Sequence, residues 1–527
     1  MGARRFFFRL LPAYPTLYQG EKVFSDFLPP SVGYVYFPLI VDSREGFASG
    51  HFMNNPLSRL YLSATRRSSG KTTIAVGLCR ALRDRGIAVQ PFKKGPDYID
   101  PIWLGMASDR DCHNLDFHTM GSREIQAFFL RESAHANISI IEGNQGLYDS
   151  VDVKGKNSNA ALARLLRTRV VLIIDTHGMT RSIVPLLLGY QTFEPEVKIA
   201  GVLLNHVGDS RHEGKLRAAI DYYTDLPVLG AIPRDIGIEI PERHLGLVPG
   251  NELGGAHAFI ARAARIVEAN VALDRLIEIS DSAPSLTHTA MEEDIARNPS
   301  QNVGSIGKAP VKIGIPRDPA FGFYYPGDLA ALRRAGSELV FFDTFSDTTL
   351  PPVDGLFIGG GFPEVHREAL EANVALRRSI RAAIENGIPA YAECGGLMYL
   401  TRGISWHGKR HEMVGAIPAE TVMRARPRGR GYVVLRETGK GPWNLSPQGG
   451  QSVEIRAHEF HHADIAISEP GKGFEYAYEV LRGYGIDGKH DGIAFRNLLA
   501  GFSHLRDVGK NHWAKRFVGY VRKIRDM

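Results

Sequence analysis

The sequence has little cysteine: Cys79, Cys112 and Cys394 are the only three among 527 residues. They show neither the closely spaced pairs that bind zinc nor the density of a disulfide framework. This pattern argues against a zinc-finger protein and against a disulfide-stabilised secreted domain. It is typical of a protein from a reducing compartment, and we expect a cytoplasmic location.

The sequence also lacks long apolar runs, tandem repeats and basic clusters. No stretch approaches the length of a transmembrane helix, and the apolar run after Arg5 is interrupted by Arg9 and Pro12 with no small-residue cleavage site. Lys and Arg (63) exceed Asp and Glu (57), but the net charge of +6 is spread along the chain. We therefore expect no membrane and no nucleic acid as partners, and the mild positive balance suits an anionic small molecule.

The length of 527 residues predicts two to three domains. Residues 57–269 and 311–527 each show strands that alternate with helices, and residues 270–310 are polar and turn-rich, as expected of a linker. Residues 1–56 contain no identifiable chemistry. We interpret them as an extension or as the product of a mis-assigned translation start.

A phosphate-binding loop is predicted between a strand at Tyr61–Ala64 and an amphipathic helix that begins at Lys71. Backbone N–H groups in such a loop bind phosphate oxygens, Lys71 would reach the β and γ phosphates, and the Thr72 hydroxyl would hold Mg²⁺. A chance Ser-Gly-Lys-Thr at a helix start is the alternative, but the strand before it and the helix after it favour ATP binding. The predicted ATP contacts are Ser68, Ser69, Gly70, Lys71, Thr72, Thr73 and Asn205.

Charged residues follow two further predicted strands of the first domain. Lys93, Lys94, Asp97 and Asp100 come after a strand at Ile87–Phe92, where they suit a site for Mg²⁺ and anions. The Gly-Pro-Asp within this segment is also ordinary turn chemistry, so the segment alone decides nothing.

Glu142 follows a strand at Ile138–Ile141, where a second Mg²⁺ ligand is expected beside a phosphate loop. We predict Thr72, Asp97 and Glu142 as the Mg²⁺ ligands. Later strands at Val170–Asp175, Ile199–Asn205 and Val228–Pro233 complete a mostly parallel, doubly wound α/β sheet.

A nucleophile elbow is predicted in the second domain. A strand at Ala390–Glu393 leads directly into Cys394 and a helix that opens with two glycines. A sharp turn of this kind exposes the sulfur, and the helix N-terminus favours the thiolate. Gly360 and Gly361, after a strand at Gly355–Ile358, could supply N–H groups to an oxyanion. The alternative is that Cys394 is only a small buried hydrophobic residue.

A cysteine nucleophile needs a base, and two groups of histidines follow Cys394. One is the cluster His458, His461 and His462, and the other is His504 near the C-terminus. Metal binding by the first cluster is conceivable, but no other feature argues for zinc. The chemistry of the residues leaves the choice between the two groups open.

The order of these motifs resembles the cobyrinic acid a,c-diamide synthase family of glutamine-dependent amidases, from about Leu60 to the C-terminus. The segments that carry the resemblance are Ser69–Thr73, Gln90–Lys93, Gly95–Pro101, Asn114–Asp116, Glu142–Gly143, Arg243–Pro249, Gly359–Glu364, Glu393–Leu400 and His458–His461. The long motif at 95–101, followed in order by a glutaminase elbow, makes the match specific.

The resemblance implies a dethiobiotin-synthetase-like ATP domain followed by a class I glutamine amidotransferase domain of flavodoxin-like fold. Cys394 would attack the side-chain amide of glutamine, with His504 as the activating histidine. The first domain would use ATP and Mg²⁺ to phosphorylate a carboxylate of an anionic tetrapyrrole, which ammonia then converts to an amide. We predict Lys93, Asp97, Tyr98 and Asp100 to bind this acceptor, and a homodimer is the candidate assembly.

Several positions depart from the family's pattern. Ala64 and the Arg66-Arg67 pair replace glycine and small residues in the phosphate loop. The segments Phe92–Gly95, Ile102–Leu104 and His504–Asp507 look closer to a sister branch, the sirohaem amidase of sulfur metabolism, which is one alternative acceptor assignment. Within them, Lys94 and Arg506 are the first candidates for specificity. A cobyric acid synthase-like amidase is a second alternative. A P-loop regulatory ATPase without glutaminase activity is a third, from another functional class.

Overall fold

The computed structural model describes residues 57–234, 236–243, 246–286, 309–444, 453–467 and 474–527. All described residues belong to one compact unit. The predicted extension at 1–56 lies outside the described residues. So do positions 287–308 of the predicted linker and 244–245 of the segment Arg243–Pro249.

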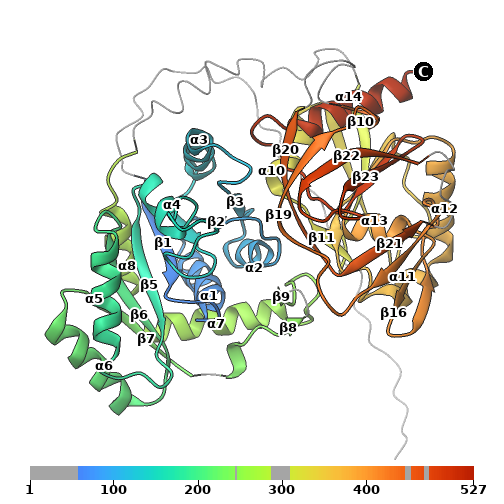
Figure 1. Ribbon diagram of the computed structural model, residues 1–527. Coiled ribbons are helices and arrows are strands. Elements are labelled where there is room, and N and C mark those ends of the chain that lie inside the picture. The colour runs from blue at the N-terminus through green and yellow to red at the C-terminus, as the bar shows by residue number, and fades with distance from the viewer. Residues whose placement is uncertain (1–56, 235, 244–245, 287–308, 445–452, 468–473) are drawn as a thin grey trace, which may run out of the picture. The chain divides into compact units, whose positions relative to one another are not determined.

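The N-terminal half is built on a seven-stranded parallel sheet (Figure 1), with strand order β3-β2-β4-β1-β5-β6-β7. The central strands β1 and β4 are buried along their whole length, which explains their nearly continuous apolar sequences. The strands are β1 (Arg59–Ala64), β2 (Val89–Lys94), β3 (His113–Leu115), β4 (Ile138–Glu142), β5 (Arg169–Asp175), β6 (Ile199–Val207) and β7 (Val228–Pro233). The prediction of a parallel sheet is confirmed.

Helices cover both faces of this sheet because alternate strand residues point to opposite sides. Leu60 and Leu62 pack in a core with α1 (Lys71–Asp84), α2 (Ile99–Ser108), α7 (Ala256–Asn270) and α8 (Leu273–Asp281). Tyr61 packs in the core on the other face with α3 (Ser122–Ser133), α4 (Asn159–Leu165), α5 (Ile183–Phe193) and α6 (Ser210–Tyr223). Between β7 and α7 lie a 3-10 turn at Ile236–Ile238 and a small hairpin of β8 (Glu242–Arg243) and β9 (Gly246–Leu247). The half is doubly wound.

Helix α8 lies inside the segment that the sequence predicts as a linker, 270–310. Its apolar residues Leu273, Leu276 and Ile279 are buried in the same core as α1 and α7. The turn-rich composition of the later part of the segment obscures this short amphipathic helix. The nucleotide-binding core therefore extends through α8, beyond residue 269.

The C-terminal half is built on a nine-stranded mixed sheet, with strand order β12-β10-β13-β15-β24-β23-β22-β19-β20. The strands from β12 to β24 in that order run parallel, and those from β24 to β20 are antiparallel. Their bounds are β10 (Val311–Pro316), β12 (Ser337–Phe342), β13 (Gly355–Ile358), β15 (Ala390–Glu393), β19 (Gly429–Glu437), β20 (Glu454–His461), β22 (Glu475–Arg482), β23 (His490–Phe495) and β24 (Leu498–Gly501).

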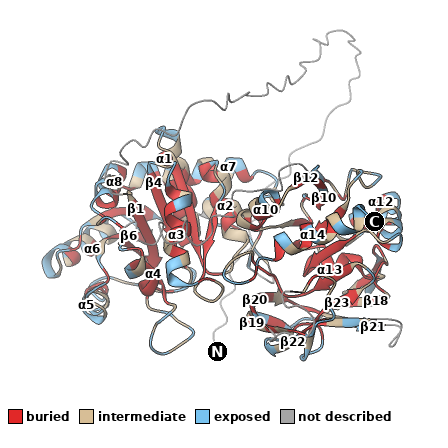
Figure 2. Cartoon of the chain, turned by 90° about the horizontal axis from the view of Figure 1, so that it is seen from above, coloured by how far each residue is buried: buried red, intermediate tan, exposed pale blue. Residues whose placement is uncertain are grey.

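Two smaller sheets accompany it. One pairs β11 (Phe321–Phe323) with β14 (Gly360–Gly361). The other has the order β17-β16-β18-β21 and comprises β16 (Gly403–Trp406), β17 (Lys409–Glu412), β18 (Ala419–Met423) and β21 (Ala463–Ile467). Figure 2 shows that the strands of both large sheets are mostly buried, whereas the outer faces of the helices are exposed.

Two groups of helices cover the nine-stranded sheet. On one face lie α10 (Pro326–Arg334) and α14 (Trp513–Arg525), and on the other lie α11 (Arg367–Ala372), α12 (Val374–Glu385) and α13 (Gly395–Leu400). Asn373 separates α11 from α12, because its side chain accepts a hydrogen bond from the Leu376 N–H (3.2 Å) and caps α12. Among the described residues, no helix is long and apolar enough to cross a membrane.

Candidate active sites

The phosphate loop follows β1 and ends where α1 begins. Gly70 has a left-handed backbone (φ 80°), and a Cβ there would lie 2.2 Å from Nδ2 of Asn205. That amide donates a hydrogen bond to the carbonyl of Ser69 at 3.0 Å. Only glycine therefore fits at position 70. Asn205, at the carboxyl end of β6, holds the loop in place through this hydrogen bond.

Lys71 is mostly buried behind the loop, and its Nζ donates to the carbonyl of Arg66 at 3.2 Å. Burial and the neighbouring charge of Lys93 lower the pKa of Lys71 to about 8. A cation that is poorly compensated by the protein gains most from an anionic ligand. This environment suits phosphate binding.

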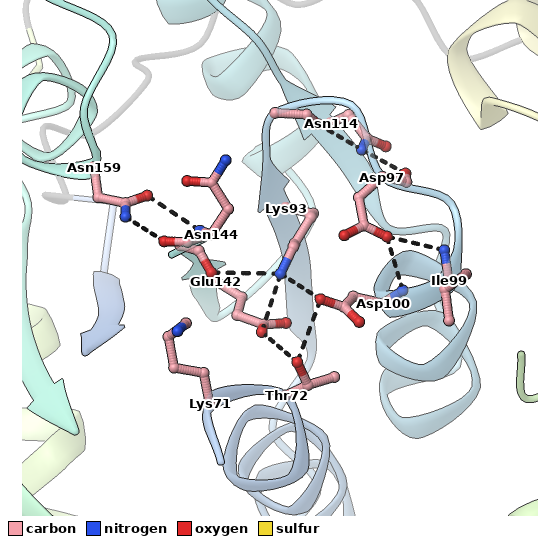
Figure 3. Close-up of polar contacts among 12 residues, drawn as sticks. Lys71, Thr72, Lys93, Asp97, Ile99, Asp100, Asn114, Glu142, Asn144 and Asn159 are labelled. Carbon is pink, nitrogen blue, oxygen red and sulfur yellow. Dashed lines mark hydrogen bonds and ion pairs between the residues drawn. The ribbon is translucent and has the colours of Figure 1, made fainter. Parts of the chain in front are cut away.

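Thr72, Lys93, Asp100 and Glu142 meet beside the loop (Figure 3). The Thr72 hydroxyl lies 2.8 Å from Oε1 of Glu142 and 3.3 Å from Oδ2 of Asp100. Lys93 pairs with both carboxylates, at 3.1 Å from Glu142 and 2.5 Å from Asp100. Burial alone would lower the pKa of Lys93, but these carboxylates outweigh it and raise that pKa above its ordinary value.

Glu142 has a second oxygen, Oε2, that is buried and makes no hydrogen bond to the protein. An oxygen of this kind next to a threonine hydroxyl fits a hard cation that also binds phosphate oxygens. Groups of three or more His, Cys, Asp or Glu side chains placed to hold a metal are absent from the described residues. An Mg²⁺ ion here would therefore depend on the nucleotide for part of its coordination.

Asp97 differs from the other two predicted Mg²⁺ ligands. Its Oδ1 accepts hydrogen bonds from the N–H groups of Ile99 (2.9 Å) and Asp100 (3.1 Å), so it stabilises the first turn of α2 (Figure 3). Burial and the charge of Asp100 raise the pKa of Asp97 to about 7. Asp97 lines the same cavity as Thr72, but it makes no hydrogen bond to Thr72 or Glu142 in the described contacts.

Cys394 lies at a sharp turn between β15 and α13, with φ 48° and ψ −103°. Its N–H donates to the carbonyl of Gly501 at 2.7 Å, which fixes the turn against β24. The next residue must be small, because a Cβ on Gly395 would lie 2.9 Å from the carbonyl oxygen of Gly361. This strained strand–turn–helix arrangement is the geometry of a nucleophile elbow.

His504 follows β24, and its Nδ1 lies 3.3 Å from Oε2 of Glu393. Burial alone would lower the pKa of His504, but its interactions with Cys394 and Glu393 outweigh burial and raise that pKa to about 10. At neutral pH the imidazole is therefore protonated next to the sulfur. Such a pair supports a thiolate nucleophile and a nearby general acid.

His504 differs from the other group of histidines in that its pKa responds to both Cys394 and Glu393. His461 stacks on Phe502 with ring centroids 3.7 Å apart, and its Nδ1 lies 3.0 Å from the carbonyl of Ala463. His458 stacks on His504, at 5.0 Å and 14°. Both histidines support the site, and neither forms a described hydrogen bond with Cys394.

Sequence reasoning missed Glu393, whose Oε2 lies 3.3 Å from Nδ1 of His504. The two residues are far apart in sequence, and the pairing of β15 with β24 places Glu393 opposite Gly501. No local motif signals this relationship. Only the register between the two strands shows it.

Gly360 and Gly361, the predicted oxyanion donors, form β14 beside this dyad. A Cβ on Gly360 would lie 2.6 Å from Cε1 of His504, and one on Gly361 would lie 1.9 Å from the carbonyl oxygen of Ala320. Side chains are thus excluded at both positions. The backbone of Gly361 lies close to the turn at Cys394, because a Cβ on Gly395 would lie 3.0 Å from the Gly361 nitrogen.

Both sites open into one cavity of about 1630 Å³. This exceeds the roughly 300–1,000 Å³ of a usual small-molecule site, so it has room for more than one substrate. The N-terminal half contributes all the predicted substrate and Mg²⁺ residues, and the C-terminal half contributes the elbow. The lining includes Ser68, Ser69, Gly70, Lys71, Thr72, Thr73, Lys93, Lys94, Asp97, Tyr98, Asp100, Glu142, Asn205, Gly361, Cys394, Arg430, His458, Arg482 and His504.

Comparisons with known proteins assign both halves. Residues 63–248 match the CobQ/CobB/MinD/ParA nucleotide binding domain, and residues 312–511 match the CobB/CobQ-like glutamine amidotransferase domain. A cobyrinate a,c-diamide synthase from Magnetococcus marinus is 45% identical over 461 residues, covering 87% of this chain and 96% of that protein. The chain belongs to the cobyrinate a,c-diamide synthase family.

Two further members of the family, both from archaea, show how far the similarity extends. The cobyrinate a,c-diamide synthases of Methanosarcina acetivorans and Archaeoglobus fulgidus are 40% and 39% identical to this chain. Each comparison covers 89% of this chain, with 96% and 98% of the respective relative. The protein is therefore an enzyme of the glutamine-dependent carbon–nitrogen ligase class, and the two predicted functional halves are confirmed.

Proposed function

We propose that this protein amidates side-chain carboxylates of a cobyrinate-type tetrapyrrole, with ATP and glutamine as co-substrates. The observation that carries the proposal is the single cavity lined by both the phosphate loop and Cys394. The names of the relatives support the choice of acceptor.

Activation of the acceptor is assigned to the N-terminal half. Ammonia does not displace hydroxide from a carboxylate, because hydroxide is a poor leaving group. A carboxylate oxygen of the acceptor would attack the γ-phosphorus of ATP, forming an acyl phosphate and releasing ADP. Ammonia would then attack the acyl carbon and expel phosphate, giving the amide. Lys71 and the loop N–H groups are placed to stabilise the phosphates during this transfer.

Mg²⁺ would neutralise charge on the transferred phosphoryl group when it is bound. Thr72 and Glu142 are the residues that fit it, because Oε1 of Glu142 lies 2.8 Å from the Thr72 hydroxyl while Oε2 makes no hydrogen bond to the protein. Lys93 compensates part of the negative charge of Glu142 and Asp100. Asp97 would act on the same site by fixing the first turn of α2, from which Asp100 extends.

Ammonia release is assigned to the C-terminal half. The Cys394 thiolate would attack the side-chain carbonyl carbon of glutamine, and the imidazolium of His504 would give its proton to the departing ammonia. Water would then hydrolyse the glutamyl thioester to glutamate. The backbone at Gly360 and Gly361 lies beside the nucleophile, where it can stabilise the oxyanion of each addition step.

One observation keeps a second acceptor under consideration. Lys94, one of the two positions closer to the sirohaem amidases, lines the cavity, and burial lowers its pKa to about 8. The other, Arg506, instead lies over the ring of Tyr325 at 4.5 Å and donates to the carbonyl of Asn114 at 3.3 Å. Lys94 is therefore the residue through which a sirohaem preference would act.

The proposal is tested by mass spectrometry of reactions with MgATP, glutamine carrying ¹⁵N in its side-chain amide, and either cobyrinic acid or sirohaem. We expect ¹⁵N-labelled amides of cobyrinic acid and ADP in matching amounts. Labelled sirohaem amide alone would move the enzyme to the alternative acceptor. Amidation of cobyrinic acid a,c-diamide but not of cobyrinic acid would instead indicate the cobyric acid synthase-like reaction.

Cys394→Ala separates the two half-reactions. Ammonium chloride should replace glutamine in this variant, because ammonia reaches the acyl phosphate without the glutaminase. Loss of ammonia-supported amidation in a folded Cys394→Ala protein would contradict the division of labour. ATP hydrolysis without any glutamate production by the wild-type protein would support the regulatory ATPase instead.

A further inference from the structure

Tyr98 extends from the N-terminal half to the catalytic histidine of the glutaminase. Its hydroxyl oxygen lies 3.2 Å from Nδ1 of His504, the ring nitrogen that also faces Glu393 at 3.3 Å. One N–H of a protonated imidazole thus has two acceptors at nearly equal distance. The position of Tyr98 decides how the hydrogen bond of His504 is shared between them.

Aromatic side chains of the C-terminal half surround Tyr98. Its ring stacks on Phe323 at 5.2 Å with an interplanar angle of 2°, and it lies 4.4 Å from the ring of Tyr325. The rings of His458 and His504 lie 5.7 Å and 5.1 Å away. Four rings therefore fix the plane of Tyr98, so a shift of its backbone is transmitted to the hydroxyl.

The backbone of Tyr98 is tied to the nucleotide site on both sides. Asp97 holds the N–H groups of Ile99 and Asp100. Asp100 in turn contacts the Thr72 hydroxyl at 3.3 Å and pairs with Lys93. Mg²⁺ bound at Thr72 must compete for the hydroxyl and carboxylate oxygens, because these are its ligands. Phosphate must compete for the Lys93 ammonium, because it is an anion. Occupancy of the nucleotide site therefore acts on the segment that carries Tyr98.

We propose that Tyr98 is a positioning residue that couples occupancy of the nucleotide site to the orientation of His504, and thereby sets the glutaminase rate. The inference rests on the proposed glutaminase role of His504 and does not depend on which tetrapyrrole is the acceptor. The Tyr98 hydroxyl, one hydrogen-bond partner of His504, moves with the Asp97–Asp100 segment. The rate of glutamine hydrolysis therefore responds to nucleotide binding.

The test measures glutamate release by the full-length protein without any tetrapyrrole, with and without Mg²⁺ and a non-hydrolysable ATP analogue. We expect the nucleotide to change the wild-type kcat by about fivefold, the effect of one hydrogen bond of ~1 kcal/mol. Tyr98→Phe keeps the stacked ring but removes the hydroxyl, and its rate ratio should fall to near one.

Tyr432→Phe is the matched control. Tyr432 lines the same cavity and its hydroxyl donates to Oδ1 of Asp116 at 2.9 Å, but it forms no described hydrogen bond with Tyr98 or His504. This variant should keep the wild-type ratio. A wild-type ratio of one, or an unchanged ratio in Tyr98→Phe, would overturn the proposal.

A second readout distinguishes positioning of His504 from a general effect on folding. The pH dependence of Cys394 alkylation by iodoacetamide reports the thiolate–imidazolium pair. Nucleotide should shift this pH profile in the wild-type protein and leave it unchanged in Tyr98→Phe. A nucleotide-induced shift of equal size in the two proteins would refute the coupling. Absence of all glutamine hydrolysis in the wild-type protein would refute the proposed function itself. The measurement of glutamate release detects this outcome.

Discussion

The carboxylate of Glu393 faces His504, with Oε2 at 3.3 Å from Nδ1, although Glu393 directly precedes Cys394 in the chain. Oε1 of Glu393 accepts from the Leu505 N–H at 2.9 Å and from the Tyr391 hydroxyl at 2.5 Å, and Oε2 is left for Nδ1 of His504. A carboxylate fixed in this way holds the imidazole in one orientation and stabilises its protonated form. Two adjacent residues thus supply the proposed nucleophile and the carboxylate that orients His504.

Glu393→Gln should lower the pKa of His504 from about 10, because the variant keeps the shape of the side chain but loses its charge. We expect kcat for glutamine hydrolysis to fall by about 10²–10⁴-fold, the range known for loss of such a carboxylate. The basic limb of the pH–rate profile should move to lower pH. Glu479→Gln, at an exposed position of β22, is the control. Wild-type rates in Glu393→Gln would exclude an orienting role.

The three cysteines should react very differently with iodoacetamide in the native protein at neutral pH. Burial raises the pKa of both the Cys79 and Cys112 thiols, so these two stay protonated. Cys394 lines the cavity and lies beside a protonated histidine. Peptide mass spectrometry should find one modified site, Cys394, and its modification should abolish glutamine hydrolysis. Modification of Cys79 or Cys112 at a similar rate would contradict this environment.

The affinity for MgATP should weaken above pH 8. Lys71 has a pKa of about 8, and its protonated form is the one that binds phosphate. Because one proton must be bound with the nucleotide, the Kd should rise by about tenfold per pH unit above that value. Calorimetric titration between pH 7 and 9 measures it. Lys71→Arg, whose charge does not titrate in this range, should flatten the profile if it still binds nucleotide. A constant Kd in the wild-type protein would contradict the prediction.

The parts of both sites that lie within one strand, turn and helix could be predicted from the sequence. The phosphate loop with Lys71 and Thr72 and the elbow at Cys394 are of this kind, because their signals occupy a few consecutive residues. His504 lies far from Cys394 in the chain, and chemistry alone did not separate it from His458 and His461. The resemblance to a family, rather than the residues themselves, pointed to it.

What could not be predicted depends on long-range register and capping. Glu393 meets His504 only because β15 and β24 pair with Glu393 opposite Gly501. The break between α11 and α12 depends on one hydrogen bond from the Leu376 N–H to Asn373, within a run that otherwise favours helix. Tyr98 and His504 come from different halves of the chain, so no sequence pattern could place them in contact.

Asp328 should make the stability of the protein pH-dependent. Burial, with a contribution from Asp507, raises its pKa from 3.8 to about 8 despite nearby Arg506. Between these values the folded state binds a proton that the unfolded state does not. This group therefore stabilises the fold less and less as pH rises from about 4 to about 8, by about 1.4 kcal/mol per pH unit.

Asp328→Asn should remove this dependence, because an amide does not titrate. In the wild-type protein the Asp507 N–H lies 2.9 Å from Oδ1 of Asp328, and the amide oxygen of the variant can still accept this hydrogen bond. Thermal or urea unfolding at pH 5 and pH 8 measures the difference. The variant should gain stability relative to the wild-type protein as pH increases over this interval. A constant difference between the two proteins would show that Asp328 is ionised in the native state throughout.

Arg482 should contribute to binding of the acceptor. It lines the cavity at the end of β22, and no described acidic side chain forms an ion pair with it. An anionic tetrapyrrole presents several carboxylates besides the one being amidated, and an uncompensated guanidinium is a suitable partner for one of them.

Arg482→Gln should therefore raise the KM for the tetrapyrrole by about tenfold, the loss expected for one charge-assisted hydrogen bond, while kcat changes little. The KM values for glutamine and ATP should stay at wild-type levels. The matched control is Arg436→Gln, because Arg436 lies on neighbouring β19 but pairs with Glu479 at 3.1 Å and does not line the cavity. Steady-state kinetics with ammonia as nitrogen donor measure the KM for the tetrapyrrole without a contribution from glutamine hydrolysis. An equal effect of both substitutions would indicate only a change in overall charge, and no effect of Arg482→Gln would place the acceptor carboxylates elsewhere in the cavity.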